Sequence, residues 1–127
     1  MSMPSSEAKV LLVEDDALAQ KIAKIIFKQL NCEIDLAASG AEAIKLSQEY
    51  AYDFILMDIG LKDMDGFTVA EHIKCHEKNA STPIIALTAH DEAFIKEQAD
   101  KSGITQILAK PLSIESGGKL LDKFLSK

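Results

Sequence analysis

The sequence predicts one α/β domain, built as a doubly wound parallel sheet of five strands with five helices. Short apolar runs alternate with longer amphipathic segments, and this strand–helix pair occurs five times along the 127 residues. A chain of this length can bury one substantial core but not two. Alternation of this kind implies right-handed crossovers, which place helices on both faces of the sheet.

The expected strands are short runs rich in valine, isoleucine and leucine. Runs that are apolar at nearly every position are typical of strands covered on both faces. A short apolar run can also be a buried part of a helix, but the lengths of these runs and the turn residues at their ends favour strands. The runs lie at residues 10–13, 34–37, 54–57, 84–87 and 104–108, and the one at 34–37 is the weakest.

The first amphipathic segment follows the first strand and predicts a helix with one apolar side packed on the core. Lysine and glutamine fill much of the opposite side. Asp16 precedes the segment and is expected to be its N-cap. The apolar positions that recur at helical spacing are Leu18, Ile22, Ile25, Ile26 and Leu30.

The second and third helices each have a clear start. Ser39, followed three residues later by Glu42, forms a capping-box pattern at the beginning of a helix over residues 39–50. A short apolar stripe over residues 67–73 then predicts a helix that begins after Gly66.

The fourth and fifth helices are expected over residues 91–102 and 113–124. An aspartate at the start and Gly103 at the end bound the fourth helix. The fifth contains Gly117-Gly118 near its start, and each glycine costs a helix interior about 1 kcal/mol relative to alanine. We therefore expect a late, irregular or frayed start to this helix.

Composition excludes several classes of protein. A net charge of -6, with 14 Lys+Arg against 20 Asp+Glu, leaves no basic surface for general nucleic-acid binding. No apolar run reaches the roughly 18 residues of a membrane span, and no signal peptide is visible. Cys32 and Cys75 have no metal-binding spacing and are typical of reduced thiols in the cytoplasm. We expect a flexible lead-in over residues 1–8 and the domain over 9–127.

Polar and charged residues follow four of the expected strands. In an open α/β sheet, ligands bind beyond the carboxyl ends of the strands, near the point where the strand order reverses. If the first, third, fourth and fifth strands are neighbours, one edge of the sheet gathers carboxylates, a hydroxyl and an ammonium. The residues concerned are Glu14-Asp15-Asp16, Asp58, Thr88-Ala89 and Lys110-Pro111.

This combination suits phosphoryl transfer to a carboxylate. Carboxylates that converge without a partner repel one another, and a hard cation removes that repulsion. Oxygen ligands in small number favour Mg²⁺, which keeps several waters and shares a phosphoryl oxygen. Lys110 can neutralise a second phosphoryl oxygen, and Thr88 can donate a hydrogen bond to a third.

The motifs VLLVEDD, DFILMDIGLKDMDG, PIIALTA and ILAKP occur in this order, each at an expected strand end. With these motifs, the sequence resembles the receiver domains of response regulators and hybrid histidine kinases in two-component systems. The resemblance runs from about Lys9 to the C-terminus. It implies the flavodoxin-like fold with strand order 2-1-3-4-5, and the fragment IIALTAH is more similar to hybrid-kinase receivers than to transcription-factor receivers.

The resemblance also implies a role for each site residue. Asp58 would be the phosphoacceptor, and Mg²⁺, for which Mn²⁺ can substitute, would bind beside it. Thr88, Ala89 and Lys110 would contact the phosphoryl group, and the Lys110-Pro111 peptide would be cis. The metal ligands would be Asp15, Asp58, the backbone carbonyl of Gly60 and, through water, Glu14.

The resemblance further implies partners and output. A histidine kinase or a histidine phosphotransfer domain would supply the phosphoryl group, and the face of helix 4, strand 5 and helix 5 would then adjust. This face would also allow a weak homodimer. The domain would catalyse only its own phosphorylation and dephosphorylation, in the cytoplasm, without direct contact to nucleic acid or membrane. A parent chain of the sensor-kinase type would place it on the cytoplasmic side of a membrane-bound protein.

Four positions affect how such a receiver would signal. Ile107 stands where an aromatic residue is usual, which predicts a different coupling to Thr88. Lys62 stands where proline is usual, so the loop after Asp58 is expected to be less rigid. Gly60 and His90 occupy positions that tune hydrolysis of the phosphoryl group, and we expect His90 to affect its lifetime.

Three other functions share parts of this pattern. A haloacid dehalogenase-like phosphatase would need a second aspartate two residues after Asp58, where this chain has Gly60. A flavodoxin-like cofactor binder would need a phosphate loop after the first strand, where Glu14 and its neighbours would repel phosphate. A degenerate receiver, which binds partners without being phosphorylated, is favoured only by Ile107 and Lys62.

Overall fold

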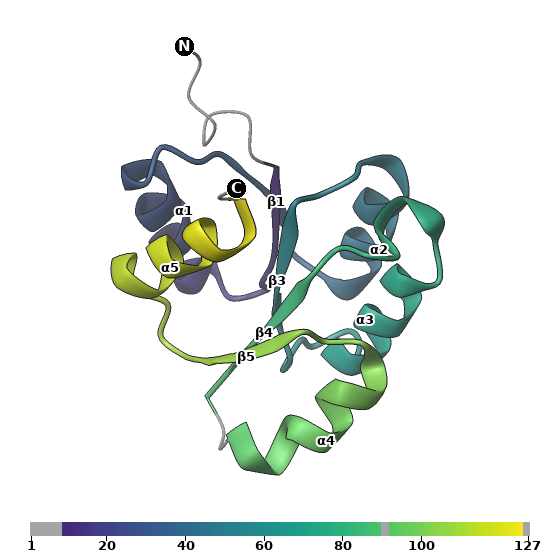
Figure 1. Ribbon diagram of the computed structural model, residues 1–127. Coiled ribbons are helices and arrows are strands. Elements are labelled where there is room, and N and C mark those ends of the chain that lie inside the picture. The colour runs from purple at the N-terminus through teal and green to yellow at the C-terminus, as the bar shows by residue number, and fades with distance from the viewer. Residues whose placement is uncertain (1–8, 90–91, 126–127) are drawn as a thin grey trace.

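The computed structural model describes residues 9–89 and 92–125, and it contains one parallel sheet of five strands. The strand order is β2-β1-β3-β4-β5, as the resemblance implies (Figure 1). All four neighbouring pairs are parallel. The strands are β1 (Val10–Val13), β2 (Ile34–Ala37), β3 (Phe54–Asp58), β4 (Ile84–Thr88) and β5 (Gln106–Ala109).

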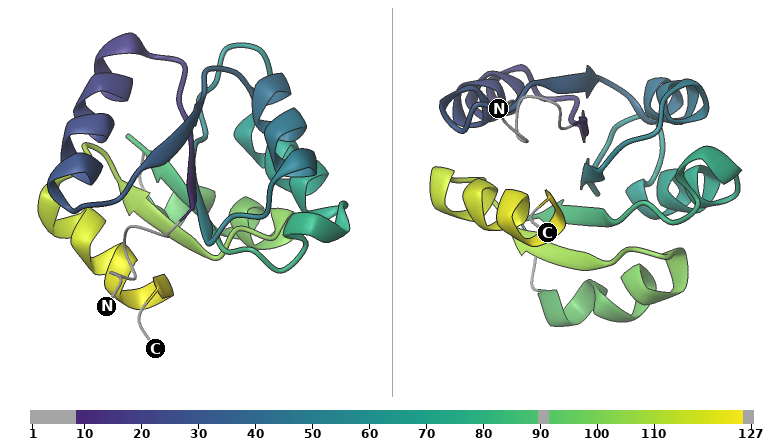
Figure 2. Two further views of the ribbon diagram at one scale, coloured as in Figure 1. Left: turned by 90° about the horizontal axis from the view of Figure 1, so that it is seen from above. Right: turned by 45° about the horizontal axis from the view of Figure 1, so that its top comes forward.

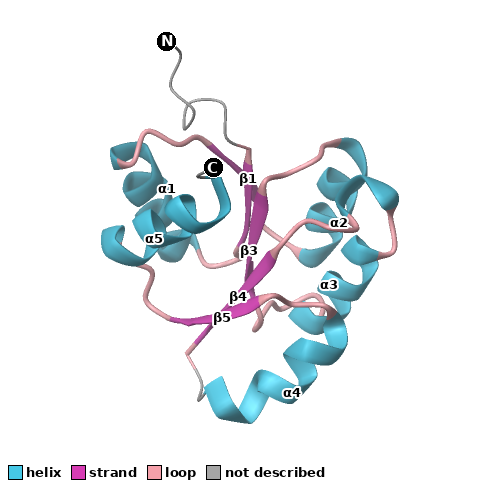
Figure 3. Ribbon diagram, in the orientation of Figure 1, coloured by secondary structure: helices cyan, strands magenta, loops and turns pink. Residues whose placement is uncertain are grey.

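The helices cover the sheet on both faces, so the molecule has three layers (Figures 1 and 2). The first and last helices lie together on one face, and the other three cover the opposite face (Figure 3). A 3₁₀ turn, η2 (Glu77–Asn79), follows the third helix. The helices are α1 (Ala17–Gln29), α2 (Gly40–Glu49), α3 (Gly66–Lys74), α4 (Glu92–Ser102) and α5 (Ile114–Leu125).

Alternate residues of the central strands belong to two different apolar cores, one on each face of the sheet. Leu11 and Ile55 belong to the core beneath α2, α3 and α4, whereas Leu12 and Leu56 belong to the core beneath α1 and α5. The continuous apolar runs of the sequence therefore reflect strands that are buried on both faces.

The predicted apolar stripe of α1 is confirmed at Ile26 and Leu30, which pack on the core, and is wrong at its other positions. Leu18 is 66% exposed and Ile25 is 57% exposed, whereas the fully buried side of the helix carries Ala23, Ile26 and Phe27. Phe27, which the predicted stripe left out, is fully buried in the same core as Ala23. The helix itself and its N-cap are confirmed, since the side chain of Asp16 accepts a hydrogen bond from the Ala19 N–H at 2.8 Å.

The predicted irregular start of α5 is also wrong. The helix begins at Ile114, and the hydroxyl of Ser113 accepts a hydrogen bond from the Ser116 N–H at 3.1 Å. A Cβ at position 117 would lie 3.2 Å from Cδ1 of Leu30, so Gly117 lies where α5 packs against α1. The missing side chain thus gains interhelical packing that offsets its low helix propensity.

Smaller features of the other elements are confirmed or shifted. Ser39 caps α2 by accepting from the Glu42 N–H, but the Glu42 carboxylate bonds to the Ala38 N–H, one residue before the capping-box position. Gly103 ends α4 with φ +86, as predicted. Strand β5 begins at Gln106, two residues later than expected. The predicted lead-in over residues 1–8 and the aspartate cap of the fourth helix lie outside the described residues.

Candidate functional site

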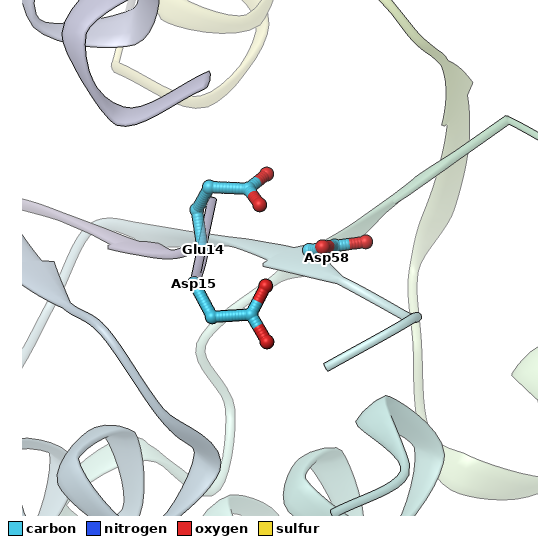
Figure 4. Close-up of side chains that lie close together, drawn as sticks. All are labelled: Glu14, Asp15 and Asp58. Atoms are coloured by element: carbon cyan, nitrogen blue, oxygen red, sulfur yellow. The ribbon is translucent and has the colours of Figure 1, made fainter. Parts of the chain in front are cut away.

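Three carboxylates meet at the carboxyl ends of the two central strands. Glu14 and Asp15 directly follow β1, and Asp58 is the last residue of β3. Val13 is paired with Met57, so the residues that follow are level with each other at the sheet edge. One carboxylate oxygen from each of the three residues lies within 4.8 Å of the others (Figure 4). The sequence predicted this convergence from the strand ends.

Lys110 brings a positive charge to the same place. Its Nζ lies 3.3 Å from Oε1 of Glu14 and 3.4 Å from Oδ1 of Asp58. The backbone holds the residue there because the Lys110 N–H donates to the Thr88 carbonyl at 2.8 Å. The Lys110-Pro111 peptide is cis, as the resemblance implied. Burial lowers the pKa of Lys110, but the charges of Asp58 and Glu14 outweigh this and raise it overall, so the side chain stays an ammonium.

Main-chain N–H groups orient all three carboxylates. Oε2 of Glu14 accepts from the Asp16 N–H at 3.1 Å, and Oδ1 of Asp58 accepts from the Gly60 N–H at 3.0 Å. Oδ2 of Asp15 accepts from the Lys62 N–H at 2.7 Å. The expectations for Gly60 concerned its carbonyl as a ligand and its place beside the phosphoryl group, and the N–H bonds from Gly60 and Lys62 were not anticipated. No sequence motif marks these bonds, since any residue except proline supplies an N–H.

The carboxylates are buried to different degrees. Burial makes their negative charges energetically unfavourable in the absence of a cation. Glu14 is 2% exposed and Asp58 is 7% exposed, while Asp15 is more open to solvent. Burial raises the pKa of Glu14, and the nearby charge of Asp58 adds to this. The Asp16 N–H and the Lys110 ammonium act in the opposite direction but do not cancel the rise. Oxygen ligands with excess negative charge fit a hard divalent cation.

The other predicted site residues lie around this cluster. Thr88 ends β4, the strand beside β3, and is 3% exposed. Ala89 follows it at the surface. Ile107 lies on β5 and packs, partly buried, against the core on the α2–α4 side. His90 lies outside the described residues.

A separate hollow lies away from this cluster. It has a volume of about 560 Å³ and is bordered by Lys24, Lys28 and Cys32, next to the start of β2. Its lining has a single carboxylate, Glu33, so it lacks the carboxylate cluster that marks the sheet edge. Burial raises the pKa of the Cys32 thiol to about 11, which makes it a poor nucleophile at neutral pH.

Among the helices that the structure describes, none is long and apolar enough to cross a membrane.

Glu14→Gln is expected to stabilise the metal-free protein. The pKa of Glu14 is higher in the folded state than its ordinary value of 4.5, so the folded state binds a proton more tightly than the unfolded state. The contribution of Glu14 to the free energy of unfolding therefore decreases as pH rises from about 4.5 through the pKa that Glu14 has in the folded state. Urea unfolding in EDTA should show the variant more stable than wild type at pH 7 and equal to it near pH 4. Equal stabilities at both pH values would contradict the electrostatic argument.

Comparisons with known proteins agree on one family. The model of the response regulator receiver domain family matches residues 10–122. The aerobic respiration control sensor protein ArcB of Escherichia coli is 31% identical over 96% of this chain. The matched region is 16% of ArcB, so this chain spans only a small part of that relative's length.

Two solved structures extend the comparison. One is the receiver domain of the sensor histidine kinase PA1611 from Pseudomonas aeruginosa, with a magnesium ion coordinated in its active-site cleft. It is 30% identical, with a TM-score of 0.86, and the match covers 94% of this chain and 98% of that one. The other is the receiver domain of Ssk1 from Saccharomyces cerevisiae, crystallised with the histidine phosphotransfer protein Ypd1. It is 28% identical, with a TM-score of 0.85, over 93% and 88% of the two chains.

Proposed function

This chain belongs to the response regulator receiver domain family of two-component signalling, and from that premise we propose that Asp58 is its phosphoacceptor. The observation that carries the proposal is the contact of Lys110 Nζ with Oδ1 of Asp58 at 3.4 Å, beside the carboxylates of Glu14 and Asp15. An acceptor carboxylate needs a fixed position and a neighbouring positive charge to receive an anionic group. Both are present here at the open end of the sheet.

The acidic cluster fits Mg²⁺, and Mn²⁺ is expected to replace it. We assign Asp15, Asp58 and the backbone carbonyl of Gly60 as direct ligands and Glu14 as a ligand through water. The ion would neutralise charge on the phosphoryl group and hold one of its oxygens. The magnesium in the related receiver of PA1611 supports this assignment.

The remaining steps use the side chains of this protein. A carboxylate oxygen of Asp58 attacks the phosphorus in line, forming an O–P bond as the N–P bond to the donor histidine breaks. Lys110 compensates the charge on the phosphoryl oxygens, and Thr88 and Ala89 donate hydrogen bonds to them from the end of β4. Water later cleaves the acyl phosphate and restores Asp58. The domain is thus catalytic only toward its own modification.

The donor is proposed to be a histidine kinase or a histidine phosphotransfer domain. The complex of Ypd1 with the receiver of Ssk1 supports a phosphotransfer partner, and the sensor proteins among the relatives support a parent chain of the sensor-kinase type. We place the domain in the cytoplasm, or on the cytoplasmic side of such a parent. The output is assigned to the face of α4, β5 and α5, which would also form a weak homodimer, with Ile107 and His90 adjusting the response.

Incubation with acetyl phosphate and Mg²⁺ tests the proposal directly. Intact-mass spectrometry should show one added phosphoryl group per chain, and EDTA should prevent the addition because the three carboxylates would then repel the anionic donor. Mn²⁺ should restore labelling. If no mass is gained with either ion, the protein is a degenerate receiver, which is the alternative that Ile107 and Lys62 favour.

A further inference from the structure

The loop between β3 and α3, residues 59–65, contacts the metal-binding end of the sheet through its backbone. We call this segment the acceptor loop. The Lys62 N–H donates to Oδ2 of Asp15 at 2.7 Å, although the two residues are 47 positions apart in the chain. The side chain of Lys62 is exposed and takes no part in this bond. The contact therefore depends on the peptide N–H at position 62 and not on the lysine as such.

The acceptor loop is also fastened to the N-terminus of α2. The carboxylate of Asp63 accepts from the Gly40 N–H at 2.9 Å and from the Ala41 N–H at 3.1 Å. These backbone bonds, with Gly40 first, lower the pKa of Asp63, so the side chain stays ionised. Met64 lies directly over Gly40, where a Cβ would be 2.5 Å from Cγ of Met64. The loop is thus fastened to α2 directly after Lys62.

The element that supports the loop is itself tied to the strand that carries Asp15. Helix α2 follows β2, which pairs with β1 in the register Val13↔Ala37. The Glu14 N–H extends this ladder by donating to the Ala37 carbonyl at 3.0 Å. Hydrogen bonds and the chain itself therefore connect Asp15 to β1, β2, α2 and the acceptor loop, and the loop in turn bonds to Asp15.

We infer that the main-chain N–H of Lys62 is a positioning group that holds the Asp15 carboxylate ready for the divalent cation. Asp15 is the most exposed of the three carboxylates, so it has the most side-chain freedom to lose when the ion binds. A carboxylate has about four lone-pair directions, so accepting one N–H leaves the others for a metal. The inference rests on the proposed function, because it takes Asp15 as a metal ligand.

A matched pair of variants separates the N–H from the side chain. Lys62→Ala keeps the N–H, and Lys62→Pro removes it. The readout is the dissociation constant for Mg²⁺, from the amide NMR shifts of residues at the carboxyl ends of β1 and β3. Lys62→Ala should match wild type, and Lys62→Pro should bind Mg²⁺ on the order of 10-fold more weakly, as is usual when a partner of a metal ligand is lost.

A third variant covers the case in which the proline ring disturbs the loop. The α-hydroxy analogue of lysine, introduced at position 62, replaces only the donating N–H by an ester oxygen. Urea unfolding in EDTA identifies any variant whose fold has changed. In metal-free wild type, a scalar coupling across the hydrogen bond between the Lys62 nitrogen and the Asp15 carboxyl carbon should be measurable, which a purely structural role of the lysine would not require.

The outcomes are distinguishable. Weaker Mg²⁺ binding in the proline and ester variants, with unchanged binding in Lys62→Ala, supports the inference. If wild type binds Mg²⁺ and the ester variant binds it equally well, the N–H does not position Asp15 and the inference is overturned while the proposed function stands. If wild type itself binds no Mg²⁺, the proposed function and the inference both fail.

Discussion

Replacing Asp58 by asparagine is expected to abolish phosphoryl uptake from acetyl phosphate, with a loss on the order of 10³-fold or more, as when a nucleophile is removed. Asparagine keeps the size of the side chain and an oxygen that can accept the Gly60 N–H, which in wild type bonds to Oδ1 at 3.0 Å. The change therefore removes the attacking oxygen with little effect on the local structure. Intact-mass spectrometry with Mg²⁺ measures the extent of labelling.

The matched control is Asp100→Asn. Asp100 is a surface aspartate on α4 that pairs with Lys96 at 3.5 Å, and its side chain is 65% exposed. This variant should be labelled like wild type. Equal labelling of wild type and Asp58→Asn would show that another residue accepts the phosphoryl group and would contradict our assignment.

The architecture was predictable because the burial of a strand determines which of its positions are apolar. Strands β1, β3 and β4 are covered on both faces, so nearly every position in them is apolar and the runs are easy to find. The helix α1 was found for the same kind of reason, but part of its buried side was misassigned. Periodicity counts apolar residues without knowing which of them face a partner, and Leu18 stays exposed although it fits the pattern.

The candidate site likewise has a part that the sequence predicts and a part that it does not. The charged side chains were predicted because parallel strands end at one edge, which brings Glu14, Asp58 and Lys110 together. The backbone donors were not predicted, because an N–H has no sequence signature and its partner is set by loop geometry. The loop after Asp58 was expected to lose rigidity without a proline, yet Lys62 uses the N–H that proline lacks to bind Asp15.

Replacing Lys110 by alanine is the second change with a large expected effect. Its ammonium lies within 3.4 Å of carboxylate oxygens of both Glu14 and Asp58, and its own side chain is 29% exposed. Loss of one positioned charge from a phosphoryl-binding site is expected to slow phosphorylation of Asp58 by about 10²- to 10³-fold. Time courses of labelling by acetyl phosphate at saturating Mg²⁺ measure the rate.

The control for charge alone is Lys119→Ala, which removes a lysine that pairs with Glu115 at 3.6 Å and whose side chain is 77% exposed. Solvent screens such a pair, so this variant should be phosphorylated at the wild-type rate. Lys110→Arg keeps the charge but replaces a compact ammonium with a planar fork, so it should recover only part of the loss. If Lys110→Ala reacts as fast as wild type, the metal carries the whole charge compensation, and the ion pairs of Lys110 serve only to balance Glu14 and Asp58 before the cation binds.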